Sequence, residues 1–421
     1  MNLINISNLG SGMTLAQDIK DQHGRLLASC GQEITPKLIR IFKIWGIGKI
    51  RINESGGKES NIELPYNLPE NILQKATDIV RHRFQYNDIN DTFVYELFRI
   101  SCLRKARNLF EVSEKNRLND HFIPEIVPAQ KVPNAGKQKM NVDHLIEKTL
   151  RLETIPDIYY KIIAAINNPE ASLHDIAQIV NKDITLSAKV LQLVNSSFYS
   201  LRQKVDTLTW ALALIGTNQL MNIVSGVSAV SLFKNIPSQL INMASFWEHS
   251  IACGTTARLL AGHCNRRVAA ERFFVAGLLH DIGRLILIQN LPGPCLDLFQ
   301  RARKEEIFLF VAETDKFNMD HSHIGAQMAF HWNLPETLVD MINDHHLPGR
   351  EKAFFEASII NMSDIIVNAL EIGNSGEFFV PVIEPRVCTE LHLNKDMLQP
   401  LINQLENQLE DIFQIIYGIP E

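Results

Sequence analysis

The sequence predicts a mostly helical protein, in which a small α/β module precedes one large all-helical domain. From residue 142 to residue 421, apolar residues recur at three- and four-residue steps, which is the period of a helix with one buried face. Residues 1–53 instead carry short apolar runs separated by turn-forming residues, a pattern typical of strands. Between the two, residues 66–111 show the helical period, and residues 112–141 are polar and contain several prolines, which predicts a linker.

The predicted N-terminal module is built from short segments. GMTLAQDI and RLLAS flank the turn-forming DQHG, an arrangement that favours a hairpin. A helix is expected at TPKLIRIFKIWG, followed by a further strand at KIRIN, and the polar GGKES ends the module.

The predicted C-terminal domain is a succession of helices with a C-terminal helical extension. Several of these helices are opened by Asp, Ser or Thr, or are ended by Asn-Pro or a glycine. The amphipathic segments include MNVDHLIEKTLRL, PDIYYKIIAAINN, SLHDIAQIVNK, TLSAKVLQLVN, DTLTWALALIG and NQLMNIVSGVSAVSLF.

Composition narrows the class of protein. The chain has 421 residues, of which 46% are hydrophobic and 21% charged, as in ordinary globular proteins. A formal net charge of -6 argues against general binding to nucleic acid or to an anionic membrane. No apolar run approaches the roughly 20 residues of a membrane helix, and the first residues lack the pattern of a signal peptide. The six scattered cysteines form no C-x-x-C pair and are expected to be reduced thiols, so we expect a cytoplasmic protein.

Histidine and aspartate crowd into the second half of the domain, beginning with the pair His280-Asp281 inside the apolar run GLLHDIGRLIL. A carboxylate in such surroundings costs several kcal/mol unless something compensates it. Imidazole and carboxylate together suit Fe, Mn, Zn or Mg rather than metals that prefer thiolates. The candidate metal ligands are His249, His280, Asp281, His321, His345, His346 and Asp364.

Each of these residues, taken alone, also has an ordinary structural explanation. His249 is compatible with a packed histidine that makes one hydrogen bond. His280 and Asp281 are compatible with a buried ion pair, or Asp281 with a helix cap. His321 stands at the start of a predicted helix, where it is compatible with a capping residue.

The same holds for the pair His345-His346, which is compatible with exposed loop residues near a helix end. Asp364 lies on an otherwise apolar helix, where a lone carboxylate is difficult to explain without a partner. The remaining histidines of the region are expected at the surface or behind the ligands: His263, His323 and His331.

The order of these residues resembles that in the HD superfamily of metal-dependent phosphohydrolases, and most closely its HDOD branch. The resemblance extends from about residue 142 to about residue 372. It begins with TIPDIYYKIIAAINNPEASLHDIAQIVNKDITLSAKVLQLVNSSFYS and DTLTWALALIGTNQL. It continues through FWEHS, AGLLHDIGRLIL, DHSHIGAQMAFHWNLPETLVDMINDHH and the helix of Asp364. The resemblance implies an all-helical HD-type domain that keeps a site for divalent metal.

Residues 1–53 resemble a module that precedes some HD-GYP cyclic-di-GMP phosphodiesterases, which implies a role in signalling. The chain departs from HD-GYP enzymes at two points. The sequence after His346, LPGREKAFFEAS, has no glycine-tyrosine-proline loop, and Arg284 stands where those enzymes have lysine. Arginine and lysine differ as phosphate ligands because only arginine binds bidentately.

Two functions follow from the resemblance. In a hydrolase, two divalent ions bridged by Asp281 would activate water and clamp a phosphate, with Arg284 as a donor to the substrate. In a regulator, the helical domain binds a signalling partner or a nucleotide, and the metal site is structural. We favour the regulator, because HDOD proteins are regarded as signalling or output modules and both departures weaken a phosphodiesterase site.

Overall fold

The computed structural model describes most of the chain outside the two predicted connecting regions. The described residues are 2–5, 14–20, 26–29, 31–32, 34–35, 38, 42, 49–53, 68–118 and 157–418, the last range with gaps at 167, 200, 202, 234–235, 265–269 and 349–352. Four predictions therefore fall largely or wholly outside the described residues: the DQHG turn, the helix at 35–46, the linker beyond residue 118, and the helix MNVDHLIEKTLRL.

The chain divides into two compact units. The first contains residues 1–81, 90–122 and 394–407, and the second contains residues 82–89, 123–393 and 408–421. Helix α19 (Lys395–Ile416) contributes to both units.

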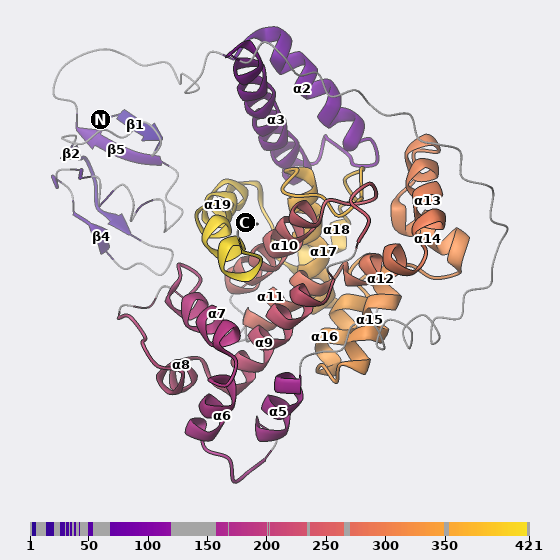
Figure 1. Ribbon diagram of the computed structural model, residues 1–421. Helices are drawn as coiled ribbons and strands as arrows, with labels where there is room; N and C mark the ends of the chain where they lie inside the picture. The colour runs from indigo at the N-terminus through magenta and orange to yellow at the C-terminus, as the bar shows by residue number, and fades with distance from the viewer. Residues whose placement is uncertain are drawn as a thin grey trace. The chain divides into compact units, whose positions relative to one another are not determined.

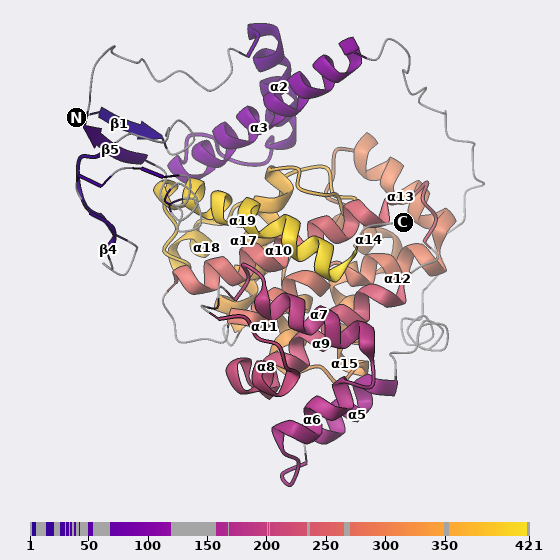
Figure 2. The ribbon, with the colours of Figure 1, turned by 60° about the vertical axis from the view of Figure 1, so that its left-hand side comes forward.

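The strands of the first unit form two small antiparallel sheets (Figures 1 and 2). One sheet has the order β1-β5-β2, with Leu3 opposite Arg51 and Thr14 opposite Asn53. The other pairs β3 with β4, as the predicted hairpin requires. The strands are β1 (Asn2–Asn5), β2 (Thr14–Leu15), β3 (Ile19–Lys20), β4 (Leu26–Ala28) and β5 (Lys49–Asn53).

The helices α2 (Glu70–Arg83) and α3 (Thr92–Leu118) follow the strands. Helix α3 continues beyond residue 111, where the sequence pattern placed the start of the linker. The continuation has a simple cause, because neither proline nor glycine occurs between that point and Pro124, and the added turns contain the good helix formers Glu114, Lys115, Arg117 and Leu118.

The second unit is helical, which confirms the predicted fold class. Between residues 157 and 418 the described residues form helices, turns and bends but no strand. The helices of this unit up to residue 263 are α5 (Asp157–Ile166), α6 (Leu173–Val180), α7 (Ile184–Asn195), α8 (Leu208–Ile215), α9 (Thr217–Leu232) and α10 (Met243–His263). Those that follow are α11 (Ala270–Leu279), α12 (Ile282–Asn290), α13 (Pro292–Lys304), α14 (Leu309–Phe317), α15 (His321–His331), α16 (Glu336–Asn343), α17 (Phe354–Ala369) and α18 (Pro385–Glu390).

Local sequence explains several helix starts. Ser172 and Asp175 form a capping box, in which the Ser172 hydroxyl accepts from the Asp175 backbone and the Asp175 carboxylate accepts from the Ser172 backbone. The side chains of Asp183 and Thr207 cap α7 and α8 in the same sense. These caps satisfy backbone N–H groups that have no partner within their own helix.

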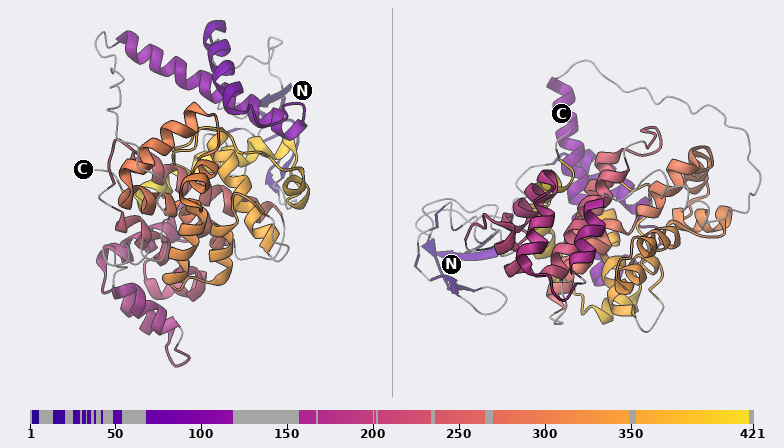
Figure 3. Two further views of the ribbon diagram at one scale, coloured as in Figure 1. Left: turned by 90° about the vertical axis from the view of Figure 1, so that its right-hand side faces the viewer. Right: turned by 60° about the horizontal axis from the view of Figure 1, so that its bottom comes forward.

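Helix α10 lies at the centre of the second unit and packs against α11 and α17 (Figure 1). Helix α15 packs against both α12 and α16, and in the left panel of Figure 3 this orange part faces the viewer. The helices α5 to α9 form the other part of the unit, with α9 against α11. Among the described residues, none of the helices has both the length and the apolar character that crossing a bilayer requires.

Two helix crossings in this unit involve backbone packed on backbone. A Cβ atom added to Gly277 of α11 would lie 2.6 Å from the Cα atom of Gly254 in α10. A Cβ atom added to Gly283 of α12 would lie 2.0 Å from the carbonyl oxygen of His321 in α15. Because no side chain separates these helices, residues near each crossing are brought within contact distance of one another.

Candidate metal centre

The structure brings all seven predicted ligand residues into one cluster in the second unit. The cluster is assembled from α10, the junction of α11 and α12, the start of α15, the turn after α16, and α17. Six of its members are buried, and only His346 is partly exposed. The seven residues are His249, His280, Asp281, His321, His345, His346 and Asp364.

The two aspartates lie among the histidines. Nε2 of His249 lies 3.1 Å from Oδ1 of Asp364 and 3.7 Å from Oδ2 of Asp281. Nε2 of His280 lies 3.3 Å from Oδ2 of Asp281 and 3.7 Å from Oδ1 of Asp364. Asp364 therefore has the partners that a carboxylate on an apolar helix needs, and they are residues from α10 and from the α11–α12 junction.

Asp281 is the N-cap residue of α12 by position, but its side chain makes no capping hydrogen bond. Its carboxylate is turned instead toward His280, His321 and Arg284. Of the two structural explanations open for Asp281, the cap is therefore excluded and the ion pair is present.

Two histidines are fixed in the tautomer that suits a metal ligand. Nδ1 of His280 donates to the carbonyl oxygen of Gly277 at 2.7 Å, and Nδ1 of His345 donates to that of Ile342 at 2.7 Å. Each ring then presents an Nε2 lone pair to the cluster when neutral, which is the arrangement that backbone carbonyls impose on metal-binding histidines. Among the described residues, Nε2 of His249, His280 and His345 has no hydrogen-bond partner.

A divalent cation would give these buried nitrogens and the two carboxylates, which lie 3.1–3.7 Å from Nε2 of His249 and His280, a common partner. Nε2 or Nδ1 of His249 and His280 and one oxygen of Asp281 all lie within 4.8 Å of one another, as one metal ion requires. A second such group consists of His321, His345 and His346. The residues present therefore fit a divalent ion, most completely at the first group.

His321 is held by carboxylates on both sides of its ring. Nδ1 lies 2.5 Å from Oε2 of Glu313, and Nε2 lies 2.9 Å from Oδ1 of Asp281. The cap of α15 is Asp320, whose carboxylate accepts from the backbone N–H groups of Ser322 and His323. His321 is thus not the capping residue, and its side chain is free to enter the cluster from the first position of the helix.

Arg284 is buried in the same part of the cluster. Its NH1 group donates to Oδ2 of Asp281 at 3.1 Å, and to the carbonyl and hydroxyl oxygens of Ser375 at 3.0 and 2.8 Å. Its Nε lies 3.5 Å from Oε1 of Glu313, and its NH2 group lies 3.0 Å from Nε2 of His321. The NH1 group is therefore held by Asp281 and Ser375, whereas Nε has no hydrogen-bond partner among the described residues.

The pKa values shift in different directions within the cluster. Burial lowers the pKa of His280, but Asp281 outweighs it and holds that pKa well above its usual range. Burial raises the pKa of Asp281, but Arg284 and His280 outweigh it and hold that pKa well below its usual range. Burial and Arg284 lower the pKa of His321, but Glu313 and Asp281 raise it to about 9, so this ring is a cation. Burial lowers the pKa of His345 to about 3, with further lowering by His280 and His321, so His345 is neutral and can act as a ligand.

Sequence reasoning did not find Glu313 or Ser375. Glu313 is buried in α14 and accepts from the His321 backbone at 2.8 Å as well as from the ring. A signal was present, because Glu313 stands on the apolar stripe of its helix with Leu309 and Phe317. Ser375 lies in a loop, where the sequence offers no periodicity to indicate which way a side chain points.

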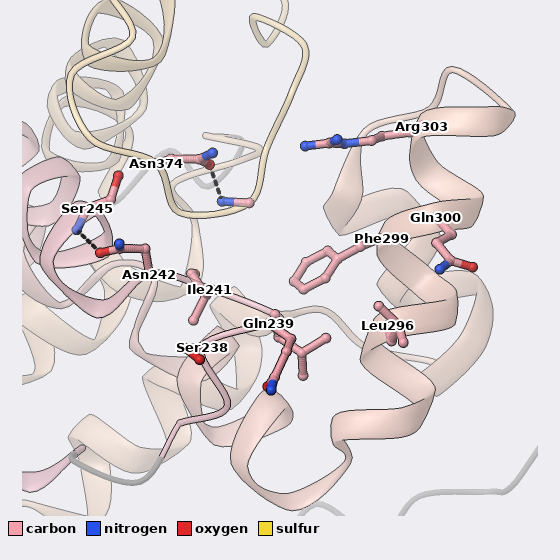
Figure 4. Close-up of a pocket in the computed structure, with 12 residues that line it drawn as sticks. Ser238, Gln239, Ile241, Asn242, Ser245, Leu296, Phe299, Gln300, Arg303 and Asn374 are labelled. Carbon is pink, nitrogen blue, oxygen red and sulfur yellow. Dashed lines mark hydrogen bonds between the residues drawn. The ribbon is translucent and has the colours of Figure 1, made fainter. Parts of the chain in front are cut away.

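A separate cavity of about 320 Å³ lies on the other side of this loop (Figure 4). Phe299 and Arg303 of α13 face Asn374 and Asn242 across it. Its amides are partly used by the fold, since Asn242 caps α10 through the Ser245 N–H and Asn374 accepts from Gly376. None of the cluster residues lines this cavity, so it is not the metal centre.

Comparison with known families decides the assignment of the region that carries most of this cluster. The family model for the HDOD domain matches residues 152–348. Residues 152–348 are an HDOD domain. Asp364 lies beyond the matched residues, so the second unit extends the HDOD domain by a helix that supplies one member of the cluster.

One curated protein is similar to part of this chain. A protein of Treponema pallidum (strain Nichols), named only as uncharacterized, is 26% identical over 199 residues, which is 47% of this chain and 38% of that protein. The chain thus matches about two fifths of that relative's length.

Solved structures share the fold. An HDOD domain protein of unknown function from Geobacter sulfurreducens superposes with a TM-score of 0.50 at 23% identity, over 66% of this chain and 98% of that one. A protein from Shewanella amazonensis SB2B with a provisional phosphohydrolase name superposes with a TM-score of 0.52 at 19% identity, over 65% and 97% of the two chains.

Proposed function

We propose that this protein is a signalling or regulatory protein whose HDOD domain holds one divalent ion and does not hydrolyse cyclic dinucleotides. The observation that carries the proposal is the buried guanidinium of Arg284, which lies beside Asp281, Glu313 and His321 inside the histidine cluster. In this role the domain acts through a protein partner, as the family resemblance implies.

The ion would be held by Nε2 of His249, His280 and His345 together with carboxylate oxygens of Asp281 and Asp364. Bound there, it would supply positive charge to the two carboxylates and join α10, α17 and the turns after α11 and α16. Three imidazoles with two carboxylates favour Fe, Mn or Zn, since Mg prefers oxygen ligands.

A second ion has an obstacle at the position that a two-metal hydrolase would use. Arg284 and the cationic His321 already neutralise Asp281 and Glu313 on that side. A further divalent cation would have to displace two buried positive charges, which Coulomb repulsion in a poorly screened interior opposes. Arg284 therefore stands in for the second cation, with its NH1 group held by Asp281 and Ser375 rather than turned toward a substrate.

The alternative is a metal-dependent phosphohydrolase, and the second group of candidate ligands favours it. His321, His345 and His346 are spaced to hold an ion of their own once Arg284 moves away. Asp281 would then bridge two ions, and Arg284 would turn to the substrate phosphate.

The two functions differ in metal content and turnover. The full chain, loaded with Mn²⁺ or Fe²⁺ and dialysed, is expected to retain one ion per chain by elemental analysis and to leave cyclic di-GMP and nucleoside monophosphates intact. Asp281→Ala is expected to lose the ion or much of the protein's stability. Retention of two ions, with hydrolysis that Asp281→Ala abolishes, would establish the hydrolase instead.

A further inference from the structure

A cavity of about 420 Å³ opens beside His346, at the partly exposed edge of the histidine cluster. Its walls come from the start of α14, the turn after α16, the start of α17 and the segment that leads into α18. The volume falls within the range of small-molecule sites, which is about 300–1,000 Å³. Most of its lining is apolar, including Phe308, Phe310, Phe354 and Val382.

Planar rings form one side of this cavity. Phe308 is stacked on Phe310 with ring centroids 5.8 Å apart and planes at 14°. Phe310 is stacked on His346 with centroids 4.5 Å apart and planes at 15°. The three rings are therefore nearly parallel and present flat apolar surface that leads toward the cluster, a surface that suits a flat ligand.

One buried polar atom has no partner at this cavity. Asn361 of α17 is 5% exposed, and its Nδ2 donates to the carbonyl oxygen of His345 at 2.8 Å. Because only the NH₂ group can donate to a carbonyl, this bond fixes the orientation of the amide. Its Oδ1 is left without a hydrogen-bond partner among the described residues, so this acceptor is available to an N–H donor in the cavity.

The charged side chains in the lining of the cavity narrow the class of ligand. The charged side chains that line the cavity are Glu384 and Arg386, which have opposite signs and are both exposed. The Arg386 guanidinium lies 4.1 Å from the ring centroid of Phe354, so it is partly engaged by a cation–π contact. Among the described residues, the lining therefore offers no buried positive charge to hold a phosphate or a carboxylate.

We propose that this cavity binds a neutral, planar heteroaromatic molecule whose ring N–H donates to Oδ1 of Asn361 while its faces lie against apolar side chains. The ligand would lie beside His346 and Asn361. Because Asn361 donates a hydrogen bond to the His345 carbonyl, the bound ligand would lie next to the histidine cluster. The inference takes the regulatory role of that cluster from the proposed function, but binding itself requires no metal.

The test uses the full chain and two probes of the same shape. Indole carries one ring N–H, and 1-methylindole lacks it. Isothermal titration is expected to show indole binding at least tenfold more tightly than 1-methylindole. Equal affinities for the two probes, or tighter binding of guanosine monophosphate than of indole, would overturn the proposal.

Two tryptophan variants locate the site. Val382→Trp fills the cavity from its rim, where Val382 is 39% exposed, and it is expected to weaken indole binding at least tenfold. Leu214→Trp is the matched control, since Leu214 is 50% exposed on α8 and does not line the cavity. Equal loss in both variants, or no loss in Val382→Trp, would contradict the assignment.

Titration with and without a chelator separates this inference from the proposed function. Indole binding that persists in EDTA, in protein that retains no ion under any condition, would support the cavity and overturn the metal site alone. Retention of an ion in protein that does not bind indole would support the metal site and overturn the proposed ligand cavity.

Discussion

Replacing Arg284 with methionine tests whether its guanidinium takes the place of a second cation. Methionine keeps the length of the side chain but removes three hydrogen bonds, one to Asp281 and two to Ser375, and the 3.5 Å contact with Glu313. Asp281 and Glu313 would then remain buried without the guanidinium that faces both.

The expected cost is large. Removal of one partner from a buried ion pair destabilises a protein by about 3–5 kcal/mol, because the other charge stays buried. A total free energy of unfolding is about 5–15 kcal/mol. For a domain of this size, 1 kcal/mol corresponds to about 2–4 °C in Tm, so Arg284→Met in EDTA should unfold about 6–20 °C below the wild type.

Divalent metal should repair much of this loss, because the vacated position can accept a cation. An ion at 100 times its Kd adds about 2.7 kcal/mol per site. Thermal unfolding in EDTA and in excess Mn²⁺ is therefore expected to show a deficit that shrinks by about half or more in Mn²⁺, with metal content rising from one ion to two per chain.

The reasoning fails if the deficit is the same in EDTA and in Mn²⁺, or if Arg284→Met still retains one ion. Arg301→Met is the matched control, since Arg301 pairs with Glu305 and Asp315 through side chains that are 39–52% exposed. Exposed pairs contribute about 0–1 kcal/mol, so this variant should unfold close to the wild type at either metal concentration.

Three further changes have defined outcomes. Gly277→Ala puts a Cβ atom 2.6 Å from the backbone of Gly254 and should lower Tm by about 2–12 °C, because overpacking costs about 1–3 kcal/mol. Gly262→Ala meets nothing within 4 Å and should change Tm little. Asp364→Asn removes a carboxylate beside the orphaned imidazoles and should lower metal affinity at least tenfold by titration, with the helical circular dichroism unchanged. Burial raises the pKa of Glu377 from 4.5 to about 7. The contribution of this carboxyl to the free energy of unfolding is therefore complete below pH 4.5 and is lost as the pH rises through 7. In the Glu377→Gln variant, the free energy of unfolding should fall by up to about 3 kcal/mol less than in the wild type over this pH range.

Each of these has a contrary result. Similar Tm values for the two glycine variants would show that the helices at Gly277 separate without cost. Unchanged metal affinity in Asp364→Asn would place the ion in the group of His321 and His346. Parallel pH profiles for wild type and Glu377→Gln would show that the Glu377 carboxyl is ionised throughout, held by the three backbone N–H groups that it accepts from.

The helical domain followed from the sequence because apolar periodicity is a local property that packing reinforces. The membership of the cluster followed from a resemblance in chain order, since no local signal joins His249 to Asp364. Contacts with distant segments of the chain decide whether each of these residues is a helix cap, a member of an ion pair or a packed side chain. The cap of α15 is the exception, because Asp320 is a preferred N-cap residue and the sequence alone could have assigned it.

The direction of Arg284 could not be predicted in the same way. Its side chain points inward because Asp281 and Ser375 hold it, and Ser375 lies 91 residues away in a loop without periodicity. Glu313 shows a related limit, since one carboxylate on an apolar stripe indicates burial but not the partner. The sequence therefore predicts that such buried charges are paired, but the identity of the partner residue depends on how the helices pack.

The glycine crossings set different limits on how the sequence of this domain can diverge. At Gly277 and Gly283 no other side chain fits without moving a helix, so these positions have little freedom to change. A ligand such as His249, by contrast, contributes a side chain that a neutral residue of similar size can replace without disturbing either crossing. A lineage can therefore lose metal ligands singly while the scaffold persists, and a domain of this architecture can pass from metal-binding to metal-free forms with its helix crossings unchanged.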